Sequence, residues 1–182
     1  MKNIQISITV FLTLISINCN KVQNTNFVMI KEGIGIEKVI VGKTTFNDIV
    51  LTYGKEYNKI NHLNYSYEIN YSKLGLAFYY KYADKTKTIY AIKLKSPFNA
   101  RTHKGIALGR SKMEDVISIY GPPKWRTTEK GKTWWNEYKG IEFHVEKDKS
   151  LPEFPLNEGI HIKKTIIQID IESKNNYQNT LF

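Results

Sequence analysis

The chain has 182 residues, 41% of them hydrophobic, which is enough to fill one core of ordinary size or two small ones and excludes a disordered chain. Its 27 lysines and arginines against 17 aspartates and glutamates give a formal net charge of +10, which favours anionic partners without choosing among them. Because Cys19 is the single cysteine, an intrachain disulfide and a cysteine-based zinc site are both excluded.

Residues 1–18 are predicted to be a signal peptide. Lys2 supplies a positive charge, and the apolar run that follows is shorter than the roughly 18 to 20 residues needed to span a bilayer. The run ends at Cys19, and residues 14–19 resemble the lipobox of bacterial lipoproteins, in which the cysteine thiol receives diacylglycerol. We therefore expect Cys19 to be the lipid attachment site, with residues 19–33 forming the lipidated cysteine and a polar tether. The alternative is that Cys19 is an incidental residue of a signal peptide that is cleaved near this position, which would leave a soluble secreted protein.

The strongest signal is an internal repeat. Residues 41–54 match residues 108–121 at a constant offset of 67 without gaps. Both copies place apolar residues at helical spacing and end in Tyr-Gly, which predicts two short amphipathic helices. Thr44 or Thr45 is the expected N-cap of the first helix, and Ser111 that of the second, in a capping box with Glu114.

Strand patterns follow each helix. Residues 65–71 alternate strictly, residues 74–78 correspond to 139–143, and residues 88–94 correspond to 165–171. The change of offset implies a twelve-residue insertion between residues 148 and 164, expected to be a hairpin extension or ordered loop. The fold class is therefore α+β, with two tandem units, residues 34–100 and 101–172, each a short helical segment packed on a roughly four-stranded antiparallel sheet. Residues 173–182 are expected to be a flexible tail.

The pattern of a glycine, a short amphipathic helix and a Tyr-Gly stop, present in residues 42–54 and again in residues 109–123, resembles a known repeat. It is similar to the unit of the β-lactamase inhibitor proteins and of the SmpA/OmlA outer-membrane lipoproteins. That resemblance covers about residues 34–172 and implies tandem sheets that join into a concave surface gripping a partner protein. It transfers no individual contact residue, because the inhibitory loops are not reproduced in this sequence.

Aromatic and basic residues lie close together in the strand regions of both units, and large rigid side chains beside positive charge are typical of a protein-binding face. Alternation along a strand requires one of two adjacent aromatics to point away from the helix. The alternative is that these rings only pack against one another across the seam between the units. The residues expected to contact a partner are Tyr80, Tyr82, Trp125, Arg126, Trp134, Trp135 and Tyr138.

No catalytic, cofactor or metal motif is recognised. The four histidines, His62, His103, His144 and His161, have no metal-ligand spacing and no nearby cluster of carboxylates, and are expected to be surface or strand residues. The leading hypothesis is a non-enzymatic lipoprotein of the bacterial cell envelope that holds a protein or an anionic envelope component as adaptor, assembly factor or inhibitor. Its export signal disfavours nucleic acid as a partner, and the sequence does not indicate an oligomeric state. The alternative from another class is an envelope enzyme acting on an acidic polymer through Glu137, Glu142 and Asp170.

Overall fold

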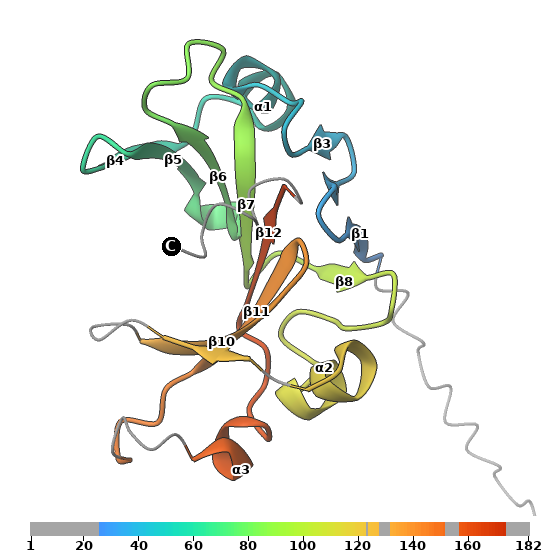
Figure 1. The fold of residues 1–182 in the computed structure, drawn as a ribbon. Coiled ribbons are helices and arrows are strands. Elements are labelled where there is room, and N and C mark those ends of the chain that lie inside the picture. The colour runs from blue at the N-terminus through green and yellow to red at the C-terminus, as the bar shows by residue number, and fades with distance from the viewer. Residues whose placement is uncertain (1–25, 123, 128–131, 152–156, 174–182) are drawn as a thin grey trace, which may run out of the picture.

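A computed structural model describes residues 26–122, 124–127, 132–151 and 157–173. An eight-stranded antiparallel sheet carries helices α1 (Phe46–Tyr53) and α2 (Met113–Tyr120) on one side, and a four-stranded sheet lies between the two helices (Figure 1). The expected α+β class is confirmed. Cys19, the signal peptide of residues 1–18 and the tail from residue 174 onward lie outside the described residues. Within them, no helix is long and apolar enough to cross a membrane.

The eight-stranded sheet has the order β4-β5-β6-β7-β12-β11-β10-β9. We call α1 with β4–β7 the first half and α2 with β9–β12 the second half. Each half is a helix followed by four strands in consecutive order, and the halves meet where β7 pairs with β12, with Lys93 opposite Asp170. The strands are β4 (Asn58–His62), β5 (Ser66–Tyr71), β6 (Leu76–Lys81), β7 (Ile89–Lys95), β9 (Trp125–Arg126), β10 (Thr133–Tyr138), β11 (Ile141–Glu146) and β12 (Gln168–Glu172).

The helix starts differ from expectation in the second half. Thr45 caps α1 as expected, since its hydroxyl accepts from the Asp48 amide while the Asp48 carboxylate accepts from the Thr45 amide. In α2 the N-cap is Lys112, whose amide donates to the Asp115 carboxylate at 2.7 Å, so the predicted Ser111 cap is wrong. The Ser111 hydroxyl instead accepts from the Ala107 amide in the preceding turn, and this contact fixes the backbone one residue before the helix.

Matched contacts tie each helix to its sheet. The Tyr71 hydroxyl donates to the carbonyl of Gly54 at 2.8 Å, and the Tyr138 hydroxyl donates to the carbonyl of Gly121 at 3.1 Å. Both carbonyls lie at a helix end, where the backbone lacks an intrahelical partner. The two halves therefore share the same attachment of helix to sheet, which agrees with the tandem arrangement; the duplication itself stays a hypothesis.

The tight turns before β6 and β11 depend on glycine. Gly140 has φ +82°, and a side chain there would lie 2.5 Å from the Cα of Gly33. The Gly33 amide donates to the Gly140 carbonyl at 2.9 Å, so the N-terminal segment packs directly on this turn. At the corresponding turn of the first half, a side chain on Gly75 would lie 2.1 Å from the Lys95 carbonyl oxygen.

The N-terminal segment is more ordered than expected. Strand β1 (Val28–Lys31) pairs with β2 (Gly35–Ile36) and, in parallel, with β8 (Ala100–Thr102), and β3 (Val39–Ile40) completes the four-stranded sheet. Residues 28–33, placed in the tether by the sequence, belong to the fold because Ile30 is fully buried. The predicted insertion carries a short helix, α3 (Glu158–His161), and a 3₁₀ turn (Ser72–Leu74) precedes β6.

One continuous core lies between the helices and the eight-stranded sheet. Strand alternation directs apolar side chains of both halves to this side, and they pack on the helical stripes and on the four-stranded sheet. Its fully buried members include Phe78 and Phe143, at corresponding positions of β6 and β11, together with Ile49, Val116 and Ile30. Because this side is buried in both halves, any site formed by the sheet has to lie on its opposite side.

Candidate functional site

We call the side of the eight-stranded sheet that faces away from α1 and α2 the open face. Strand register aligns a row of side chains across it, and along this row the charge changes from the first half to the second. From β5 to β10 the row consists of Asn70, Ala77, Lys93, Asp170, Glu142 and Glu137. Although the whole chain is basic, the second half of its open face is therefore rich in carboxylates.

In the first half the open face carries a satisfied polar network. Lys93 donates to the Tyr79 hydroxyl, which donates to the Glu68 carboxylate at 2.7 Å. Glu68 also contacts His62 Nε2 at 3.0 Å and accepts a hydrogen bond from the side-chain amide of Asn70 at 2.8 Å. Burial acts to raise the pKa of Glu68, but the hydrogen bonds from Tyr79, His62 and Asn70 and the charge of Lys93 outweigh it and lower that pKa. Glu68 is thus held ionised by its neighbours.

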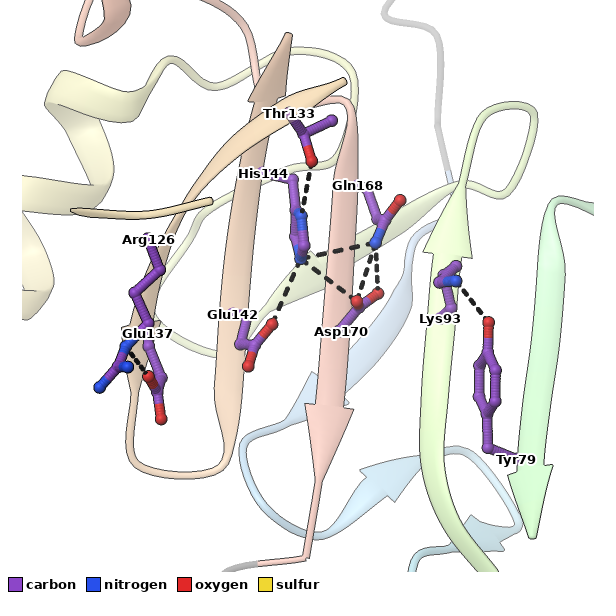
Figure 2. Close-up of polar contacts among 9 residues, drawn as sticks. All are labelled: Tyr79, Lys93, Arg126, Thr133, Glu137, Glu142, His144, Gln168 and Asp170. Atoms are coloured by element: carbon purple, nitrogen blue, oxygen red, sulfur yellow. Dashed lines mark hydrogen bonds and ion pairs between the residues drawn. The ribbon is translucent and has the colours of Figure 1, made fainter. Parts of the chain in front are cut away.

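In the second half a histidine lies between two carboxylates (Figure 2). His144 Nε2 is 3.2 Å from Asp170 Oδ2 and 3.4 Å from Glu142 Oε2. Burial acts to lower the pKa of His144, but Asp170 and Glu142 outweigh it and raise that pKa to about 9. The indole of Trp135 stacks on the imidazole, with ring centroids 5.5 Å apart. This side chain is therefore fixed by strand β11, by a stacked ring and by charge.

Further carboxylates surround this histidine. Glu137 forms an ion pair with Arg126 of β9 (Figure 2). Burial, together with the charges of Glu142, Asp170 and Glu137, raises the pKa of Glu172 to about 7. Glu172 and Asp170 also line a recess of about 220 Å³ with Tyr79, Tyr90 and Lys93, where the two halves meet. The second half of the open face thus has an excess of negative charge.

The adjacent tryptophans separate as alternation predicts. Trp134 is 4% exposed, and its ring lies 6.1 Å from that of His161 on the helix side. Trp135 lies on the open face, half-buried against His144. Arg126 pairs with Trp135 in register and shares this face. Of the residues expected to contact a partner, Trp135 and Arg126 are therefore the pair that the open face presents together.

The other expected partner-binding residues lie on the helix side. Tyr80 is 2% exposed and packs on Phe46, so it offers no surface to a partner; its neighbour Tyr79 is the outward member of that pair. Trp125 and Tyr138 are partly buried against the core, and Tyr138 is bonded to the end of α2. Tyr82 is 48% exposed but stacks on Tyr67 at the helix-side margin.

The expectation that the histidines lack nearby carboxylates is wrong. Strand pairing places Glu142 opposite Asp170, and His144 beside both, although the sequence separates β11 from β12 by the insertion. His62 likewise contacts Glu68, and His103 contacts Glu32 at 2.6 Å. Two features of the sequence could have predicted the cluster. Glu142 and His144 are two residues apart and so share one face of a strand, and the repeat makes residues 139–143 and 165–171 strands of the same unit.

Comparison with known proteins identifies a shared fold. No family model matches the sequence, and no curated protein matches it. The uncharacterized protein YfeY of Escherichia coli is similar in structure, with a TM-score of 0.58, 10% sequence identity, and coverage of 81% of this chain and 99% of that one. At this identity the similarity concerns the fold alone, and function has to be argued from the open face.

Two further structures are more distant. A DUF4309 family protein, YjgB of Bacillus subtilis, has a TM-score of 0.47 and 15% identity, with 76% of this chain and 84% of that chain covered. A cysteine-rich secretory protein, SAV1118 of Staphylococcus aureus, has a TM-score of 0.40 and 11% identity, with 82% and 51% covered. The resemblance to the β-lactamase inhibitor proteins and the SmpA/OmlA lipoproteins is not tested by these comparisons and stays an expectation.

Proposed function

We propose that the protein is a non-enzymatic binding module of the bacterial cell envelope and that a partner protein seats on the open face of the eight-stranded sheet. The observation that carries this proposal is the contrast between the two sides of the sheet. One side is a closed core under α1 and α2, whereas the other holds half-buried aromatic and charged groups, with Trp135 and Arg126 at its second half. Aromatic and arginine side chains in such settings are typical anchors of protein interfaces.

The charge of the open face favours a protein over an anionic envelope component. Asp170, Glu142, Glu137 and Glu172 lie together there and would repel a polyanion. The same repulsion argues against the alternative of an enzyme acting on an acidic polymer, because its substrate would have to approach four carboxylates. A protein can match the surface locally by placing basic groups opposite the second half and neutral groups opposite the first.

Site-specific photo-crosslinking in the native host tests the partner-binding face. A photo-crosslinking phenylalanine analogue at position 135 should give a discrete adduct with one partner. The matched control is the same analogue at position 51, because Leu51 of α1 is 85% exposed on the helix side. An adduct from position 135 and none from position 51 supports the proposal. Equal adducts from both positions, or adducts from position 51 alone, would contradict it.

We further propose that Cys19 anchors the protein to a membrane through a lipid. The supporting observation is the lipobox-like sequence ending at Cys19, after a short apolar run that begins with Lys2. Intact mass of the membrane fraction should show a diacylated chain that begins at Cys19, and Cys19→Ala should abolish it. A soluble, unmodified wild-type product would instead support the secreted form. This test is independent of which face binds the partner.

A further inference from the structure

Three potential metal ligands converge on the open face of the second half. Glu142 and His144 come from β11 and Asp170 from β12, and one donor atom of each lies within 4.8 Å of the other two. The three side chains are half-buried or buried, and that of His144 is 8% exposed. We propose that Glu142, His144 and Asp170 bind a divalent transition-metal ion, for which Zn²⁺ is the best match.

The separations suit a metal ion better than a plain ion pair. Zn²⁺ holds nitrogen and oxygen ligands at about 2.0–2.2 Å in tetrahedral geometry, which places two ligand atoms about 3.4 Å apart. His144 Nε2 is 3.2 Å from Asp170 Oδ2 and 3.4 Å from Glu142 Oε2. Charge-assisted hydrogen bonds between nitrogen and oxygen are shorter, about 2.7–2.9 Å. An ion could therefore enter between these atoms with little movement of the strands.

The surroundings hold the histidine in a ligating orientation. Thr133 Oγ1 lies 3.4 Å from the other ring nitrogen, Nδ1, and Trp135 stacks on the ring face (Figure 2). A ligating histidine usually engages its second nitrogen in this way, which leaves the first free for the metal. Antiparallel pairing of Glu142 with Asp170 adds a rigid backbone frame, so the set is preformed on strands rather than on loops.

A fourth ligand is within reach. The Gln168 amide nitrogen donates to both oxygens of Asp170, at 3.0 and 2.8 Å, and lies 3.5 Å from His144 Nε2. A half-turn of this amide would direct its carbonyl oxygen toward the ion, so Gln168 or a water molecule completes the tetrahedron. One imidazole with two carboxylates suits Zn²⁺, whereas Ca²⁺ and Mg²⁺ prefer sets of six or more oxygens.

The first half provides an internal contrast. By strand register, Glu142, His144 and Asp170 correspond to Ala77, Tyr79 and Lys93. The lysine ammonium there occupies the row position that Asp170 has in the second half, and it is bonded to Tyr79. The same frame therefore carries a ligand set in one half and a cationic side chain in the other.

Zinc titration of the purified, chelator-treated protein tests the proposal. Competition against a chromophoric Zn²⁺ indicator should give one saturable site per chain, and Zn²⁺ alone should raise the unfolding temperature, because an ion that binds only the folded state stabilises it. Mg²⁺ and Ca²⁺ at the same concentration should not compete. Glu142→Gln and Asp170→Asn should each weaken binding by at least tenfold, since loss of even an outer-shell partner typically costs about 10- to 100-fold in affinity.

Two control variants separate coordination from charge. Glu137→Gln removes the same charge from the same face without removing a ligand, and His62→Gln removes the histidine of the His62–Glu68 pair in the first half. Both should bind Zn²⁺ within about threefold of wild type. The proposal is overturned if wild type shows no saturable binding, if Glu142→Gln and Asp170→Asn bind normally, or if Glu137→Gln loses binding equally. Unfolding curves of every metal-free variant confirm that each is folded. Glu142→Gln and Asp170→Asn test the metal site independently, so the proposal can still be tested if one of them does not fold.

Discussion

The two halves of the eight-stranded sheet are alike on the helix side and different on the open face. Tyr71 and Tyr138 make the same hydrogen bond to the end of a helix, and Phe78 and Phe143 fill corresponding core positions. On the open face, in contrast, Lys93 of the first half corresponds to Asp170 of the second. Packing constrains one side of each strand and leaves the other side free to acquire separate chemistry, so differences between the halves indicate where function lies.

The largest expected effect concerns the shared helix side. Phe78→Ala and Phe143→Ala should each lower the free energy of unfolding by about 3–5 kcal/mol, because both rings are fully buried and their removal leaves a cavity in the core. Denaturant unfolding measures this, with Leu51→Ala on the exposed surface of α1 as the control. Losses that differ by several-fold between the two variants would show that the helix sides of the two halves are not equivalent.

An intermediate effect concerns the open face of the second half and depends on pH. The pKa of Glu172 is raised to about 7 from 4.5, so its carboxyl ionises more readily in the unfolded chain. The resulting destabilisation is absent below pH 4.5, grows as the pH rises to about 7, and is fully present above it. Glu172→Gln should therefore gain stability relative to metal-free wild type across this range, by roughly 3 kcal/mol at most at about 1.36 kcal/mol per pKa unit.

The control for this pH dependence is Lys95→Gln, at the corresponding position of the first half. Its stability relative to wild type should stay flat between pH 4.5 and 7.5, because no carboxyl is removed. Unfolding midpoints at several pH values provide the measurement. A pH-independent difference for Glu172→Gln would mean that burial and the neighbouring carboxylates do not raise the pKa of Glu172.

The smallest expected effect again compares matched residues. Tyr71→Phe and Tyr138→Phe should each cost about 1 kcal/mol, because each leaves a helix-terminal carbonyl, of Gly54 or Gly121, without its donor. Tyr65→Phe, at a tyrosine that is 67% exposed, serves as the control in the same denaturant experiment. If only one of the two variants loses stability, the tyrosine hydrogen bond holds the helix to the sheet in that half alone.

The sequence predicted the local elements well and the site poorly. Both helices and the strands β5, β6, β7, β11 and β12 follow from apolar spacing and terminal glycines, which are local signals. The four-stranded sheet was missed because its strands of two to four residues are too short to alternate visibly. The Glu142, His144 and Asp170 cluster is not evident from the sequence because register between distant strands assembles it. The expectation that Tyr80 contacts a partner places the buried member of the Tyr79–Tyr80 pair at the surface, because spacing alone does not tell which face of the strand points inward.

The position of β12 has a consequence for folding. This strand is the last in the described chain, yet it lies in the middle of the sheet, between β7 and β11. During synthesis from the N-terminus, β7 and β11 therefore keep an unpaired edge until β12 has been made. Insertion of β12 pairs residues that are far apart in the sequence, which slows folding. Until β12 has inserted, the exposed edges of β7 and β11 can pair with strands of other chains. The protein should thus be most prone to association just before its last strand inserts, and a chaperone that shields strand edges would act at that stage.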